Sequence, residues 1–163
     1  MLWTDADNER LVREHYPQFL ERYRSFPREI FRVDAARAMY LHRFGGVFTD
    51  LDNVCLRPFE HLLQGHGVVF GDMDSEYGGY HHKPHWLYIQ NSFIYSQPGH
   101  PFWQDMLEHI QSQSKGHDHW PQDVTGPHMM MNLLKKRWDA YAKTIAVEPP
   151  IRCAVSLQNT RYL

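Results

Sequence analysis

Two aspartates, Asp50 and Asp52, are the residues of this chain whose type and spacing most directly suggest chemistry. They follow a short apolar run that is typical of a strand, and side chains two residues apart on a strand point to the same side. Both carboxylates can then face one point just beyond the strand. Hard divalent cations prefer such oxygen ligands, and a diphosphate bound to the cation would lie beside them. The spacing therefore predicts a metal site at Asp50 and Asp52.

The element that must position these carboxylates is a helix predicted over residues 28–44. Apolar residues recur there at helical spacing, and Gly45 tolerates left-handed geometry after the last turn. Asp34 and Arg37 are three residues apart in this helix, so their side chains share one face. A solvated ion pair and a polar pair at the edge of a cleft both fit that spacing. The largely apolar neighbours favour the cleft.

The rest of the chain alternates helices with short apolar strands. Helices are predicted at 7–15, 18–25 and 59–63 and after Gly99 and Thr125, and strands at 47–50, 68–70, 87–96, 144–147 and 154–157. This alternation predicts a single α/β domain over residues 1–163, with a mostly parallel sheet flanked by helices. Ligands of such sheets bind beyond the carboxyl ends of the strands, where the two aspartates are expected.

Asn91 is a further candidate site residue, because asparagine is depleted in strands and this one lies between apolar residues. It is either a satisfied core amide or a group turned toward a ligand. The histidines at 81, 82 and 85 lack the spacing of known zinc sites. Cys55 and Cys153 are compatible with free thiols or with one disulfide.

The overall charge excludes a nucleic-acid-binding surface, since the formal net charge is −2 and basic residues are scattered. No apolar run is long enough to span a bilayer, and no signal peptide is visible at the start of the chain.

Two runs, residues 32–37 and 41–52, resemble the signature of the DxD sugar-binding glycosyltransferases, which have the GT-A fold. The branch that the chain resembles most is that of the inositol phosphorylceramide mannosyltransferases, on residues 3–5 and 16–20, with the fungal α-1,6-mannosyltransferases as further relatives. The resemblance covers about residues 2–135. Asn91 and the turns at residues 99–101 and 125–127 lie where that family has similar features.

The resemblance implies a role for each candidate residue. Asp52 would hold Mn²⁺ or Mg²⁺ on the diphosphate, and Asp50 would contact the ribose and sugar and support the metal. Asp34 and Arg37 would hold the sugar of the donor, and Asn91 would contribute to nucleotide-sugar binding. The implied reaction is a retaining transfer, with GDP-mannose as donor and inositol phosphorylceramide or a glycan as acceptor, in the Golgi. No nucleophilic carboxylate is assigned.

Members of that family carry a strand upstream of the position of Leu2 and a histidine-containing segment near the C-terminus. Neither is visible here, so the chain is expected to be truncated at both ends and its fold incomplete there. One alternative is therefore a non-catalytic fragment or pseudoenzyme that associates with a full-length transferase. A second alternative is a phosphatase of the haloacid dehalogenase type with Asp50 as nucleophile, although its further motifs are not found in the required order.

Overall fold

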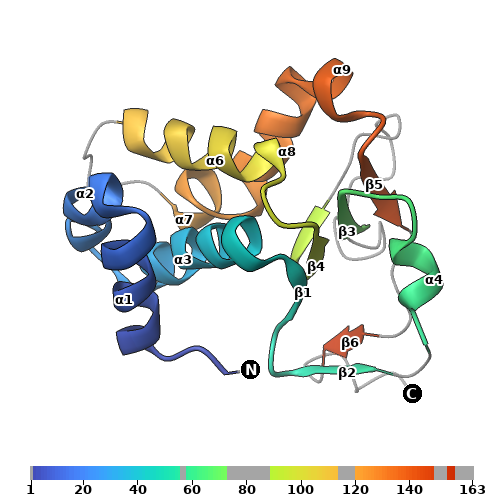
Figure 1. Cartoon of the computed structure of the whole chain (residues 1–163), viewed down its shortest axis with the longest axis horizontal. Coiled ribbons are helices and arrows are strands. Elements are labelled where there is room, and N and C mark those ends of the chain that lie inside the picture. The colour runs from blue at the N-terminus through green and yellow to red at the C-terminus, as the bar shows by residue number, and fades with distance from the viewer. Residues whose placement is uncertain (1, 56–57, 73–88, 114–119, 149–153, 157–163) are drawn as a thin grey trace.

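A computed structural model describes residues 2–55, 58–72, 89–113, 120–148 and 154–156. Helices and strands alternate along the chain, most helices pack against one face of the sheet, and the short helix α4 lies on the opposite side (Figure 1). In chain order the elements are α1 (Asp5–His15), the 3₁₀ helix η1 (Pro17–Phe19), α2 (Leu20–Arg24), α3 (Glu29–Phe44), β1 (Gly46–Thr49), β2 (Asn53–Cys55), α4 (Glu60–Leu63), β3 (Val68–Asp72), β4 (Ile89–Ser96), α6 (Pro101–Ser112), α7 (Pro121–Val124), α8 (Pro127–Lys136), α9 (Trp138–Tyr141), β5 (Ile145–Glu148) and β6 (Ala154–Ser156).

The main sheet has four strands in the order β1-β4-β3-β5, and β2 and β6 form a separate antiparallel pair. β4 is antiparallel to both of its neighbours, whereas β3 and β5 are parallel. β1, β3 and β5 therefore run in one direction. The α/β prediction is confirmed, but the expected parallel pairing is wrong for the two pairs that contain β4. An apolar run shows that a strand is buried and does not show its direction, so the reversal of β4 could not be inferred.

The helices predicted from apolar periodicity are found within a few residues of their expected bounds. The predicted helix at 28–44 is α3, and the predicted strand at 87–96 is β4. β2 was not predicted, because its three residues give no periodic signal. The histidines at 81–85 and Cys153 lie outside the described residues.

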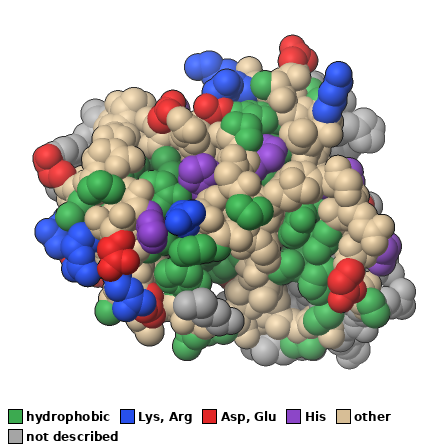
Figure 2. All heavy atoms as spheres, viewed as in Figure 1, with side chains coloured by type: hydrophobic (Ala, Val, Ile, Leu, Met, Phe, Trp, Pro, Cys, Tyr) green, Lys and Arg blue, Asp and Glu red, His purple; other side chains and the backbone are tan. Residues whose placement is uncertain are grey.

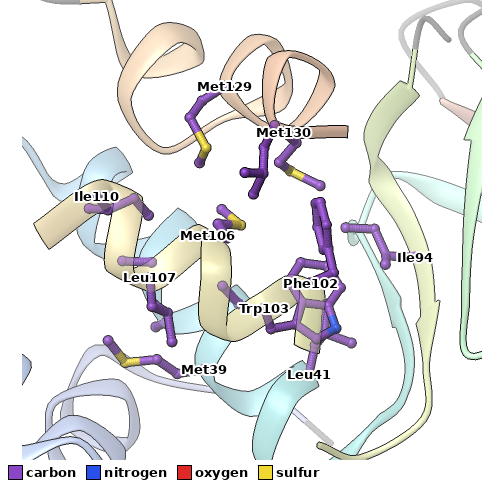
Figure 3. Close-up of a cluster of buried hydrophobic side chains, with 14 of the residues drawn as sticks. Met39, Leu41, Ile94, Phe102, Trp103, Met106, Leu107, Ile110, Met129 and Met130 are labelled. Carbon is purple, nitrogen blue, oxygen red and sulfur yellow. The ribbon is translucent and has the colours of Figure 1, made fainter. Parts of the chain in front are cut away.

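The core lies between the helices and the main sheet. α6 buries Phe102, Trp103 and Met106 against α3, α8 and β4 (Figure 3). The indole Nε1 of Trp103 donates to Ser96 Oγ at 2.7 Å, so the buried ring leaves no unpaired donor. Each fully buried side chain of this size stabilises the fold by roughly 1.5–3 kcal/mol. This core holds α3 and β4 in place. α3 carries Asp34 and Arg37, and β4 pairs with β1, the strand that leads to Asp50.

β1 begins and ends one residue earlier than the buried strand predicted over residues 47–50, and it is more exposed. It ends at Thr49, and Val47 exposes 42% of its surface. β1 lies at the edge of the sheet and pairs only with β4 among the described strands. An apolar run does not distinguish an edge strand from a central one, which is why the burial was overestimated.

The joint between α3 and β1 is made by Gly45, which has φ +65° and accepts no side chain without a clash. A Cβ atom there would lie 2.7 Å from both the carbonyl oxygen of Ser96 and Cδ of Pro98. Gly46 also has a positive φ, of +94°, but a Cβ there would meet nothing within 4 Å. A side chain at Gly45 would therefore cause both backbone strain and a steric clash, whereas a side chain at Gly46 would cause the backbone strain alone.

Gly45→Ala should lower the free energy of unfolding by at least about 2 kcal/mol, because it adds a clash to the strained backbone. Gly46→Ala, the matched control, should cost only about 1 kcal/mol, because it adds the strain alone. Urea denaturation of both variants measures the difference. Equal losses would contradict the steric role assigned to Gly45.

Candidate functional site

The candidate site is built around an ion pair inside the fold. Asp34 and Arg37 lie on the face of α3 toward the sheet and expose only 4% and 8% of their surface. Arg37 Nη1 donates to Asp34 Oδ1 at 3.1 Å, and the guanidinium lies over the ring of Phe48 on β1 with Cζ 4.4 Å from the ring centroid. The alternative of a solvated surface pair is therefore wrong, because α3 packs this face against β1.

Arg37 also connects the pair to the end of β1. Its Nη2 lies 4.0 Å from Asp50 Oδ1, so one guanidinium faces two carboxylates from different elements. Arg37 Nε is buried and has no hydrogen-bond partner among the described residues. Asp50 itself is partly exposed, and its backbone N–H donates to the carbonyl oxygen of Ser92 on β4 at 2.9 Å. The fold thus brings Asp34, Arg37 and Asp50 together.

Burial dominates the electrostatics of both carboxylates. It raises the pKa of Asp34 above its usual value, although the Arg37 guanidinium and the Thr125 hydroxyl oppose the shift. Burial also raises the pKa of Asp50, Arg37 opposes that shift, and the neighbouring Asp52 carboxylate adds to it. Asp50 and Asp52 therefore repel each other, and a bound cation would relieve that repulsion.

Asp52 does not continue the strand, contrary to the prediction. β1 ends at Thr49, and residues 50–53 form a turn in which Asn53 N–H donates to the carbonyl oxygen of Asp50 at 3.1 Å. The carboxylates are nevertheless near enough for Asp52 to raise the pKa of Asp50. The described residues contain no group of three or more His, Cys, Asp or Glu side chains that could hold a metal. Two carboxylates supply only part of a hard cation's oxygen shell, so the diphosphate and water would have to provide the rest.

Asn91 is not joined to the buried pair by any described hydrogen bond. It lies in β4 beside Ser92, the residue that accepts the Asp50 amide, and in a stretch where the β3–β4 register shifts. Its role in donor binding stays a prediction.

Thr125 is a site residue whose role the sequence did not indicate. It lies between α7 and α8, exposes 1% of its surface, and donates from Oγ1 to Asp34 Oδ2 at 3.1 Å. Each Asp34 oxygen thus has its own donor, one from Arg37 and one from Thr125. The sequence placed Thr125 only in a turn at the start of a predicted helix. Its partner is 91 residues away, and no local pattern reports such a contact.

A cavity of about 880 Å³ opens beside the site, between the start of α1, α3 and β1. Its lining includes Asp50, Thr49 and the aromatic rings of Trp3 and Tyr40, whose centroids stack 5.0 Å apart. Carboxylates and flat rings at one cavity can hold a polar ligand that carries a ring.

Residues 1–69 match the family described as the glycosyltransferase sugar-binding region containing a DXD motif. This match confirms the resemblance inferred from the sequence over residues 1–69. The matched region includes α3, Asp34, Arg37 and both aspartates of the DXD pattern.

Curated relatives extend the similarity over most of the chain. The chain is 30% identical to the mannosyl phosphorylinositol ceramide synthases CSH1 and SUR1 of Saccharomyces cerevisiae, over 90% and 85% of its length. It is 32% identical to inositol phosphoceramide mannosyltransferase 3 of Schizosaccharomyces pombe over 63% of its length. The matches cover 37%, 34% and 25% of these relatives, so the chain spans about a third of their length or less. No helix in the described part of the chain is both long enough and apolar enough to cross a membrane.

Thr125→Val should lower the free energy of unfolding by about 1–3 kcal/mol, because it leaves Asp34 Oδ2 buried without a donor. Thr125→Ser keeps the hydroxyl and is the control. The hydroxyl favours the ionised carboxyl, so its removal costs more as the pH rises through the titration of Asp34. Chemical denaturation at several pH values measures both effects. A loss that is the same in the valine and serine variants, or that shrinks with rising pH, would contradict the assigned bond.

Proposed function

We propose that this chain forms part of a retaining glycosyltransferase that moves mannose from GDP-mannose to inositol phosphoceramide or a related glycan. The observation that carries the proposal is the buried Asp34–Arg37 pair held against Asp50 at the end of β1. A charged cluster of this kind is costly to bury unless it is paired, and such clusters gather at functional sites. The relatives named as mannosyltransferases support the choice of sugar and acceptor.

The proposed chemistry uses the protein's own groups to hold the donor. Asp34 accepts hydrogen bonds from Arg37 and Thr125, and this keeps the guanidinium in one orientation beside Asp50. Arg37 then presents a fixed positive charge toward a bound sugar diphosphate, and Asp50 accepts hydrogen bonds from ribose or sugar hydroxyls. Fixed charges of this kind stabilise the transition state without reorganising during the reaction.

Asp50 and Asp52 are the residues that would hold Mn²⁺ or Mg²⁺. Their mutual repulsion fits a cation site, and carboxylate oxygens suit hard cations. When bound, the metal supplies stabilisation of the negative charge that develops on the leaving diphosphate.

A non-catalytic alternative is kept because the chain spans about a third of the relatives' length or less. A pseudoenzyme or fragment that associates with a full-length transferase would retain nucleotide binding without turnover. On the basis of the same relatives, we propose the Golgi as the compartment of both the transferase and the non-catalytic alternative. The family match favours both over a phosphatase with Asp50 as nucleophile.

Asp52→Ala should abolish Mn²⁺-dependent binding of GDP and leave thermal unfolding nearly unchanged, because Asp52 lies in a surface turn. Titration calorimetry of the parent with GDP and UDP, with and without Mn²⁺, provides the reference. Asp139→Ala, which removes an exposed carboxylate from α9, is the matched control and should bind like the parent.

The binding and transfer measurements distinguish the transferase from the non-catalytic alternative and test the metal assignment. Mn²⁺-dependent binding that prefers GDP, together with transfer of mannose, supports the transferase. The same binding without transfer supports the non-catalytic alternative. Undiminished binding by the Asp52 variant would overturn the metal assignment.

A further inference from the structure

The turn that carries Asp50 and Asp52 is fastened to β4 by the side chain of the residue that follows it. Where the turn begins, Asp50 N–H donates to the carbonyl oxygen of Ser92 at 2.9 Å. Where the turn ends, Asn53 Nδ2 donates to the same carbonyl oxygen at 2.8 Å. Both ends of the turn thus meet one acceptor on β4.

The side-chain amide of Asn53 makes two hydrogen bonds in this arrangement. Besides the bond to Ser92, its Nδ2 donates to the hydroxyl oxygen of Thr49, the last residue of β1, at 3.0 Å. A backbone carbonyl oxygen can only accept, so the amide nitrogen and not the amide oxygen must face Ser92. The side chain of Asn53 therefore links the end of β1, the turn and β4.

Side chains also support β4 at this point, where its pairing with β3 shifts register. Ser92 Oγ donates to Gln90 Oε1 at 2.9 Å, and Gln90 Nε2 donates to the carbonyl oxygen of Asp72 at 3.3 Å. A Cβ atom on Gly71 would lie 2.6 Å from Gln90 Nε2, so the glycine leaves the room that this amide occupies. The segment of β4 that Asn53 contacts is thus tied to the end of β3.

Metal binding at the turn depends on the local arrangement of its carboxylates. Basic and acidic side chains are intermixed on the face of the molecule that Figure 2 shows, and the formal net charge is only −2. With charges of both signs mixed in this way, the attraction of a cation comes mainly from the carboxylates nearest to it. Residues that orient metal ligands typically change metal affinity by roughly 10–100-fold. A residue that fixes the turn should therefore affect metal affinity through the aspartates.

We propose that Asn53 is a positioning residue of the DXD site, which fixes the turn of Asp50 and Asp52 on β4 and so sets the direction of both carboxylates toward the cation. This inference rests on the proposed function, because it concerns the same metal site. The hydrogen bonds of Asn53 form without metal or nucleotide, so the fixed turn can be tested separately from donor binding.

Residue-resolved hydrogen exchange of the full chain, without metal or nucleotide, tests the fixed turn. Asn53→Ala should speed the exchange of the Asp50 amide by about tenfold, because two bonds that hold the turn are lost. The Val68 amide, which donates to the carbonyl oxygen of Thr144 at 3.1 Å, reports opening of the main sheet and should stay close to the parent. Asn132→Ala removes an exposed asparagine from α8 and is the matched control, which should resemble the parent at both amides.

Variants of Thr49 test the same contact from the side of β1. Thr49→Val should also speed the exchange of the Asp50 amide, whereas Thr49→Ser keeps the hydroxyl and should behave like the parent. The double variant Asn53→Ala/Thr49→Val should be no faster than Asn53→Ala alone, because the two residues share one bond. Effects that multiply in the double variant would contradict that bond.

Titration calorimetry with GDP and Mn²⁺ then tests the positioning role. Asn53→Ala should weaken Mn²⁺-dependent GDP binding by roughly 10–100-fold. The midpoint of thermal unfolding should stay near that of the parent, because the Ser92 carbonyl keeps the hydrogen bond from the Asp50 amide.

Unchanged exchange at Asp50 in the Asn53 variant overturns the proposal, and so does exchange that accelerates equally at Asp50 and Val68, which would mean a general loss of stability. Faster exchange at Asp50 with undiminished GDP binding overturns the positioning role. A parent that binds no GDP in the presence of Mn²⁺ overturns the proposed function instead, and the exchange at Asp50 still decides whether Asn53 fixes the turn.

Discussion

The buried ion pair between Asp34 and Arg37 is the interaction on which the rest of the candidate site depends. Removing either partner would leave an uncompensated charge inside the fold, which typically costs 3–5 kcal/mol. Two further parts of the fold contact the pair from outside α3, because Thr125, which follows α7, donates to Asp34 and the guanidinium of Arg37 lies over Phe48 of β1. The contacts of the Asp34–Arg37 pair therefore contribute both to the stability of the fold and to the geometry of the candidate site.

The position of the DXD carboxylates follows from the joint between α3 and β1. Gly45 adopts a positive φ at the end of α3, and its lack of a side chain lets the backbone pass close to Ser96 and Pro98. Arg37 on the helix and Asp50 after the strand consequently face each other although they are 13 positions apart in the chain. The buried α6 holds both sides of this joint, since its core residues contact α3 and the sheet (Figure 3).

The sequence by itself determined the local features: the helix with Asp34 and Arg37 on one face, the glycine joint, the Asp50–Asp52 pattern and the resemblance to the DXD glycosyltransferases. Each is encoded within a few neighbouring residues, where helical periodicity and glycine geometry act. Only the tertiary structure decided that β4 is inserted antiparallel, that β1 is an exposed edge, and that Asp52 lies in a turn. It also decided the pairing of Thr125 with Asp34. These features depend on which distant surfaces pack together, and a pattern of neighbouring residues does not contain that information.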